Sequence, residues 1–266
     1  MQESPLLCGL LKTTTSEHTC LTIMRKYVKA KEPPCTERYA RWSERSVGET
    51  LPPTRLFYGI ERRFGMTKQI EELQVLFDFF REIDKEKLIE RKTYVTGAVR
   101  WENDAEHAWH MAIMTILLAD YSNEPIDVLK TVTMLLIHDL VEIDAGDTYA
   151  YSGVSKEAQH AKEEKGAKRI FGMLPGDKGQ KLYDLWMEFE EGKTAEAKFA
   201  HTMDNIQPMM LNDYTGGKAW KDHGIALSQI FKRNELTPEG SKALWDYVKE
   251  SMLKPNIESG HIRKDV

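Results

Sequence analysis

The stretch that decides how we read this 266-residue chain is His138–Asp147, HDLVEIDAGD. It follows the apolar run Met134–Ile137, so we expect a helix that is apolar almost all round and therefore buried. A buried Asp beside a buried His costs free energy unless the two side chains are paired or bind a metal ion. Adjacent residues of an α-helix point about 100° apart, which disfavours direct pairing. A cation between the two side chains would resolve the problem.

Two further residues extend this pair into a possible metal site. His107 lies about thirty residues before the pair, near the start of an expected helix, and Asp204 lies in a later helical stretch. Together the four residues would supply two imidazoles and two carboxylates. Mixed nitrogen and oxygen ligands suit manganese, cobalt, iron, nickel or zinc rather than calcium. The alternative is a His-Asp dipeptide that only forms hydrogen bonds within a core.

Helical periodicity dominates the chain from Met66 onward. Asn103 and Glu106 have the spacing of a capping box and open a helix that we expect to reach about Tyr121. A second helix is expected from Pro125 to about Ile143 and is broken by Gly146. Others are expected from the apolar stripe Ile70, Leu73, Leu76, Phe77 and Phe80 and near 155–172, 177–191, 195–213 and 239–253. No convincing strand alternation occurs, so the pattern predicts one all-α domain over residues 66–255.

The two ends of the chain differ from this domain. Residues 1–65 contain five of the ten prolines and carry 11 Lys and Arg against 7 Asp and Glu. No helical or strand period persists there, so we expect a disordered or loosely packed extension. It would arise from an upstream start codon or serve as a targeting peptide. Residues 256–266 are expected to form a tail.

Composition excludes several classes of protein. A net charge of -5 argues against binding to nucleic acid, which usually needs a basic face. No stretch approaches the roughly 18 apolar residues that span a bilayer, so no membrane segment is expected. The three cysteines all lie in the first 35 residues without C-x-x-C spacing, which disfavours a disulfide framework and a zinc knuckle. This cysteine usage indicates a cytoplasmic setting, with organellar targeting by residues 1–65 left open.

The residues around the proposed ligands are similar to a known family. The segments Glu102–His107 (ENDAEH) and His138–Asp147 resemble the HD-domain phosphohydrolases, and within them the 5'-deoxynucleotidase branch. The resemblance covers roughly residues 67–250. It implies an HD-domain helical bundle, often a homodimer, that hydrolyses deoxynucleoside 5'-monophosphates. The substrate would then be a small-molecule nucleotide.

The resemblance also assigns roles to individual residues. By position, it implies metal ligation by His107, His138, Asp139 and Asp204. It implies two additional acidic residues, Glu142 and Asp147. These would activate water and protonate the leaving group, or bind further metal ions together with Thr148.

Two arginines match substrate-contacting positions of the family. Arg91 matches a residue that contacts the substrate phosphate, with a planar fork that lysine does not offer. Arg100 sits close to the first histidine in the same way, and we expect it to be a weaker substrate contact. Lys92 departs from the pattern, because an aromatic residue often follows the first arginine.

Two alternatives to nucleotidase activity stay open at this stage. The domain could hydrolyse another nucleotide, such as a triphosphate, guanosine tetraphosphate or a cyclic nucleotide. It could also be a non-catalytic nucleotide-binding module. The complete set of four ligands and two extra acids favours an enzyme, because a binding module has no need for it.

Overall fold

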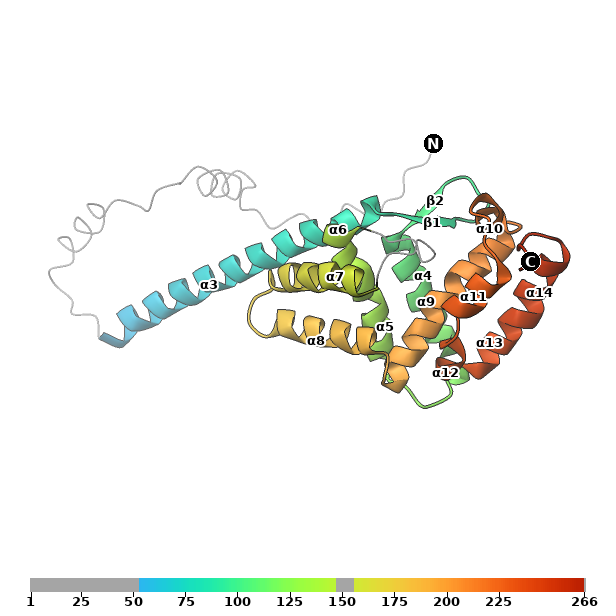
Figure 1. The fold of residues 1–266 in the computed structure, drawn as a ribbon. Coiled ribbons are helices and arrows are strands. Elements are labelled where there is room, and N and C mark those ends of the chain that lie inside the picture. The colour runs from blue at the N-terminus through green and yellow to red at the C-terminus, as the bar shows by residue number, and fades with distance from the viewer. Residues whose placement is uncertain (1–52, 147–155, 266) are drawn as a thin grey trace, which may run out of the picture. The chain divides into compact units, whose positions relative to one another are not determined.

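The computed structural model describes residues 53–146 and 156–265 of the chain (Figure 1). The chain divides into two compact units, Met1–Arg63 and Phe64–Val266. Helix α3 (Pro53–Ile83) begins in the first unit, and all later described elements belong to the second. Among the helices of the described residues, none has the length and apolar character needed to cross a membrane.

The second unit is helical apart from one small sheet, as predicted for an all-α domain. Its helices are α4 (Asp104–Leu118), α5 (Val128–Ile137), α6 (Glu142–Ala145), α7 (Lys156–Phe171), α8 (Lys178–Glu191), α9 (Ala195–Tyr214), α10 (Lys218–Asp222), α11 (Leu227–Arg233), α12 (Thr237–Gly240), α13 (Lys242–Val248) and α14 (Lys254–Glu258). Short 3-10 or π turns occur at Asp84–Leu88, Ala119–Tyr121, His138–Val141 and Lys249–Leu253.

The sheet is a feature that the sequence analysis missed. Strand β1 (Glu90–Tyr94) pairs antiparallel with β2 (Trp101–Asn103). Neither strand alternates apolar and polar residues cleanly, because β1 is mostly charged and β2 has only three residues. The expectation of no strands was therefore wrong at this place.

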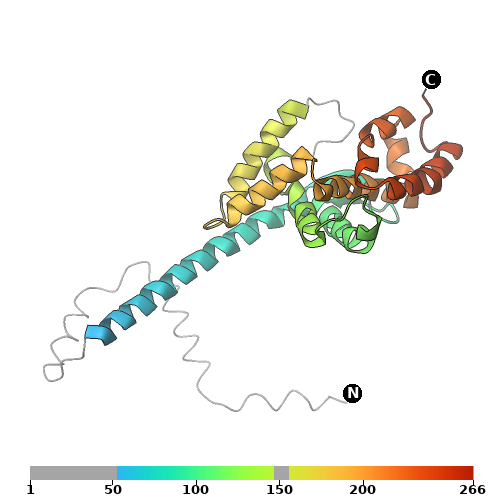
Figure 2. The same cartoon turned by 90° about the horizontal axis from the view of Figure 1, so that it is seen from below.

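Helices α4, α5 and α9 pack against one another in the middle of the second unit. Their contact faces supply fully buried residues such as Met111, Leu135 and Met203 to the larger core cluster. In both views α7 and α8 lie side by side at one end of this unit, and the C-terminal helices lie at the other (Figures 1 and 2). A second core cluster joins α7 and α8 through Phe171 and Trp186.

Helix ends follow local capping chemistry. The predicted capping box of α4 is present: the Glu106 amide donates to Asn103 Oδ1 at 2.9 Å, and the Asn103 amide donates to Glu106 Oε2 at 3.2 Å. Helix α5 begins at Val128 rather than near Pro125, because Asp127 Oδ1 accepts a hydrogen bond from the Lys130 amide at 3.0 Å.

The long helix expected to run to Ile143 is interrupted. Helix α5 ends at Ile137, the segment His138–Val141 forms a 3-10 turn, and α6 follows. The predicted break at Gly146 is confirmed, because this residue ends α6 with a φ of 74° that favours glycine. The 3-10 turn changes the directions in which the side chains of His138 and Asp139 point.

The structure adds detail at both ends of the helical domain. Helix α3 starts at Pro53, and Pro at a first helical position is compatible with a helix start. The three- and four-residue spacing of apolar residues continues upstream of Met66, at Leu56, Phe57 and Ile60. The sequence analysis did not use this signal. Residues 1–52 of the predicted extension lie outside the described residues. At the other end, packing continues beyond residue 255, since Ile262 is buried in the larger core cluster. The limits 66 and 255 stay predictions.

Candidate metal centre

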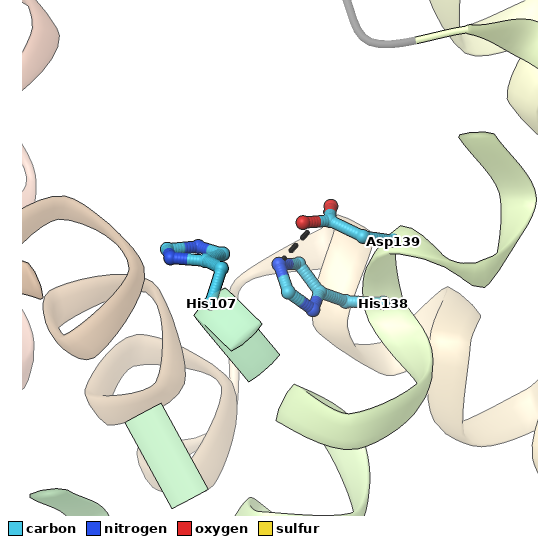
Figure 3. A group of neighbouring side chains, drawn as sticks. All are labelled: His107, His138 and Asp139. Carbon is cyan, nitrogen blue, oxygen red and sulfur yellow. Dashed lines mark ion pairs between the residues drawn. The ribbon is translucent and has the colours of Figure 1, made fainter. Parts of the chain in front are cut away.

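The centre begins with the 3-10 turn that carries His138 and Asp139. A 3-10 helix has 3.0 residues per turn, so successive side chains point differently from those of an α-helix. His138 Nε2 lies 3.1 Å from Asp139 Oδ1, and Figure 3 shows the two side chains turned toward each other. The expectation that these two adjacent side chains would not pair was therefore wrong.

Two more helices bring the other predicted ligands to this pair. His107, on the first turns of α4, is fully buried and forms a possible metal-binding group with His138 and Asp139. Asp204, on α9, places Oδ1 3.0 Å from His107 Nε2 and 4.0 Å from His138 Nε2. All four predicted ligands thus meet in the second unit, although they come from three separate stretches of sequence.

Arg91, on β1, reaches into the same group. Its Nη1 atom donates to Asp139 Oδ2 at 2.8 Å and to Asp104 Oδ1 at 3.2 Å. Its Nη2 atom lies 4.0 Å from Asp204 Oδ1. Burial opposes the charged form, but the facing carboxylates raise the pKa of Arg91, so it stays a cation. The sheet missed by the sequence analysis is what carries this residue to the centre.

The two histidines have different electrostatic surroundings. Burial, assisted by the nearby Arg91, lowers the pKa of His107 to about 4, so the ring is neutral near pH 7. For His138 burial opposes the charged form, but Asp139 outweighs it and raises the pKa of the imidazole. Asp139 is also buried, yet His138 and Arg91 hold the pKa of its carboxyl below the usual range. His138 and Asp139 therefore act as a tightly coupled pair.

The donor set fits a divalent metal ion. His138 Nε2 is shielded from solvent and makes no hydrogen bond among the described residues, although Asp139 lies close by. Two imidazole nitrogens and carboxylate oxygens converging on one place are the ligands that divalent transition metals prefer. A cation there would neutralise the carboxylates and coordinate the Nε2 atoms of both buried rings.

The remaining predicted residues have different outcomes. Glu142 is the first residue of α6, directly after the turn that carries His138 and Asp139, and its charge helps to raise the pKa of Arg91. Arg100 makes its contacts outside the centre. Its Nη1 atom donates to Glu106 Oε2 at 2.7 Å, and its side chain is 55% exposed. Asp147 and Thr148 lie outside the described residues.

The sequence analysis missed three buried or basic residues beside the centre. Gln207 on α9 contacts His107, and the buried Glu102 contacts Gln207. Arg233, at the end of α11, donates from Nη2 to Asp204 Oδ2 at 3.2 Å. No motif marks Gln207 or Arg233, because each reaches the centre through packing of distant helices. Glu102 belongs to the segment ENDAEH, but the sequence analysis gave it no role. The sequence offered one signal for Gln207. It is a polar residue three positions after Asp204 and therefore lies on the same face of the helix.

A pocket of about 350 Å³ opens beside Asp204. Its lining carries charges of both signs. The basic residues are Lys198, Lys232 and Arg233, and the acidic residues include Glu190 and Glu239. A mixed lining can bind a ligand that has both an anionic group and hydrogen-bond donors. The pocket and the candidate metal centre share Asp204.

Comparison with known proteins gives a family match. The model of the HD-domain family matches residues 83–245. A human relative named 5'-deoxynucleotidase HDDC2 is 32% identical over 136 residues, which are 51% of this chain and 65% of the relative. The relative of the same name from Dictyostelium discoideum is 31% identical over 143 residues, 52% of this chain and 75% of the relative. The chain therefore spans just under two thirds of the human relative's length.

A solved structure is more similar than these relatives. The crystal structure of a predicted metal-dependent phosphohydrolase from Magnetospirillum magnetotacticum is 40% identical to this chain. The match has a TM-score of 0.68 and covers 72% of this chain and 95% of the other. All four candidate ligands lie within the matched family region, between residues 83 and 245.

Proposed function

Because the chain belongs to the HD-domain family, we propose that it is a metal-dependent phosphohydrolase that removes the 5'-phosphate from deoxynucleoside monophosphates. One observation carries the proposal: two imidazoles and two carboxylates from three separate segments converge around His138 Nε2, with the half-buried Arg91 beside them. The names of the human and Dictyostelium relatives support the choice of substrate class.

The metal would be held by His107, His138, Asp139 and Asp204. A divalent ion bound there supplies positive charge for the phosphate and lowers the pKa of water. We propose manganese, cobalt, iron, nickel or zinc, because the donor set mixes nitrogen and oxygen. Glu142, Asp147 and Thr148 would bind any additional ions.

The chain's own acids would move the protons of the reaction. The oxygen of water forms the new bond to phosphorus, and the bond from phosphorus to the 5'-oxygen breaks. Glu142, which directly follows the turn carrying His138 and Asp139, would take the proton of the attacking water. Asp147 would give a proton to the departing 5'-oxygen. The products are a deoxynucleoside and inorganic phosphate.

Two arginines are candidates for the phosphate contact. Arg91 is our first choice, although Nη1 is already engaged by Asp139 and Asp104. Arg233 is a second candidate, because it contacts Asp204 through Nη2 only and its side chain is 43% exposed beside the pocket. A comparison of Arg91→Lys with Arg233→Lys separates them, since loss of a forked phosphate contact raises KM for the substrate. Arg100 stays a weaker proposal, because Glu106 holds its guanidinium.

The pocket beside Asp204 would receive the nucleoside. Its acidic residues can accept hydrogen bonds from the amino groups of a base, and its cationic residues can face the phosphate end. The mixed charge of the lining suits a mononucleotide better than a triphosphate, which would bring several more negative charges against Glu190 and Glu239.

The test is phosphate release from a panel of ribo- and deoxynucleoside mono- and triphosphates. Protein freed of metal with a chelator is reloaded separately with manganese, cobalt or magnesium. We expect release from deoxynucleoside monophosphates that requires added metal. Release from triphosphates, guanosine tetraphosphate or cyclic nucleotides alone would assign another substrate. Nucleotide binding without any turnover would favour a non-catalytic module.

We also propose that the protein is a homodimer. Helix α4 presents an apolar stripe to solvent, in which Trp109, Ile116 and Leu117 are 64%, 56% and 71% exposed. Four apolar residues of α3, Ile70, Leu73, Phe77 and Phe80, are also more than half exposed. Apolar stripes of this kind commonly mark protein interfaces. Light scattering of the purified protein would measure the oligomeric state.

For the cellular compartment we propose the cytoplasm. The absence of cysteine from residues 36–266 supports a setting without structural disulfides. Targeting of an organelle by residues 1–65 is the competing proposal. Fractionation of cells that express the full chain, with mass spectrometry of the mature N-terminus, distinguishes the two.

A further inference from the structure

We propose that Gln207 is a positioning residue that holds His107 in the tautomer with its proton on Nδ1. This leaves the Nε2 lone pair directed at the place where the ligands converge. The proposal rests on the metal centre proposed above, and it assigns Gln207 a share of the affinity for the cation. Gln207 lies on α9, one turn beyond Asp204, and its side chain is fully buried.

The contacts of the Gln207 amide define its orientation. Its Oε1 atom lies 2.8 Å from His107 Nδ1. Its Nε2 atom donates to Glu102 Oε1 at 2.6 Å and lies 3.2 Å from His110 Nδ1. One amide hydrogen therefore has the Glu102 carboxylate as its acceptor, the nitrogen also faces His110, and the oxygen faces His107.

The reverse orientation is unfavourable. Turning the amide over would place its oxygen against a carboxylate oxygen of Glu102 at about hydrogen-bond distance, where two acceptors repel each other. It would also face a nitrogen of His110 with an acceptor. The amide oxygen can only accept, so the Nδ1 atom of His107 must be the donor.

This tautomer has a consequence at the other side of the ring. With the proton on Nδ1, Nε2 carries a lone pair, and it faces Asp204 Oδ1 at 3.0 Å. Two acceptors this close are unfavourable unless a cation or a proton lies with them. Figure 3 shows the His107 ring beside His138 and Asp139. The possible metal-binding atoms of these three residues lie close to one another.

The second histidine is held in the same way by a different group. His138 Nδ1 lies 2.9 Å from the backbone oxygen of Leu135, which can only accept. Each histidine therefore has an acceptor on Nδ1 and directs Nε2 to the centre. The acceptor for His138 is a backbone oxygen, which a side-chain substitution does not remove, whereas the acceptor for His107 belongs to one side chain. Partners of this kind typically contribute 10–100-fold to metal affinity.

The experiment compares Gln207→Leu with Gln207→Glu and a matched control. Leucine removes the acceptor, whereas glutamate keeps an oxygen toward His107. The control is Asn212→Leu, which removes another buried amide of α9 that donates to the backbone of Pro208. We expect the dissociation constant for Mn²⁺, measured by chelator competition, to rise about 10–100-fold in Gln207→Leu. Gln207→Glu and Asn212→Leu should stay within about threefold of wild type.

A second readout is independent of metal binding. In metal-free wild-type protein, nitrogen NMR of the imidazoles should show His107 protonated at Nδ1, and in Gln207→Leu a share of the Nε2 tautomer should appear. Wild type with the proton on Nε2, or unchanged Mn²⁺ affinity in a folded Gln207→Leu, would overturn the proposal. A wild type that binds no Mn²⁺ but has the expected tautomer would instead contradict the metal centre and leave the role of Gln207 in orienting the ring.

Discussion

The two faces of helix α4 each depart from the usual distribution of polar and apolar side chains. The inner face carries His107, which is fully buried, together with the apolar core residue Met111. The outer face carries Trp109 and Ile116, each more than half exposed. The inner face thus buries a costly polar ring, while the outer face leaves large apolar groups in water. Each departure supports one of the proposals made above, a divalent cation at the inner face and a second copy of the chain at the outer face.

The difference between the faces separates two kinds of stabilisation. His107 contributes to a site whose ligands repel one another without a positive charge. Trp109 and its neighbours contribute little to the folded monomer, because burial is what makes an apolar side chain stabilising. Substitutions on the two faces should therefore affect different measurements, and four of them test this division.

The largest effect is expected from His107→Ala. Loss of an outer partner of a metal ligand typically costs 10–100-fold, so loss of a direct ligand should lower phosphate release by more than about 100-fold. Metal affinity should fall in parallel, measured by chelator competition. His223→Ala, an exposed histidine in the same unit, serves as control and should leave both unchanged. Full activity of His107→Ala would remove this residue from the metal centre.

The inner face also has an apolar part, which Met111→Ala tests. Met111 is fully buried, so truncation should lower the free energy of unfolding by about 2–5 kcal/mol. Ile113→Ala, on the exposed side of the same helix, should change it by less than about 0.5 kcal/mol. Denaturant unfolding at low protein concentration measures both. Equal losses would show that the two faces are equally buried.

The outer face is tested by the double substitution Trp109→Glu and Ile116→Glu. If this stripe covers a second copy of the chain, two buried carboxylates should raise the dimer dissociation constant by at least about tenfold, since burial of each large apolar side chain contributes about 1.5–3 kcal/mol. Light scattering over a dilution series gives the constant. Tyr247→Glu, an exposed aromatic residue on α13, is the control. A dimer that is unaffected by the double substitution would place the interface elsewhere.

The smallest effect is expected at the N-terminal end of α4, where the capping box lies. Asn103→Ala removes the side-chain acceptor of the capping box and should lower the free energy of unfolding by about 1 kcal/mol. Metal affinity should change little, because His107 is held from α9 as well as by its own helix. Thermal unfolding with and without Mn²⁺ measures the two quantities. A large loss of metal affinity would mean that the start of α4 positions His107 more than Gln207 does.

Sequence reasoning succeeded where a residue's chemistry is unusual for its surroundings. The capping box at Asn103 was predicted because the motif acts between residues three apart. The four candidate ligands were selected from their residue types, their spacing and the resemblance to the HD-domain phosphohydrolases, and the structure brings them together. It failed where the effect depended on distant partners. The strand bearing Arg91 has no apolar alternation, and the exposure of Trp109 depends on which helices cover α4.

The sequence by itself determined the helical class, the HD-domain family and the residues able to bind a divalent metal, because periodicity and residue chemistry are local properties. The tertiary structure decided that the His-Asp pair sits on a 3-10 turn, that Arg91 joins it from a strand, and that Gln207 orients His107. The positions of Arg91 and Gln207 depend on contacts between residues 48 and 100 positions apart. Only packing of the folded chain brings such residues to within hydrogen-bond distance.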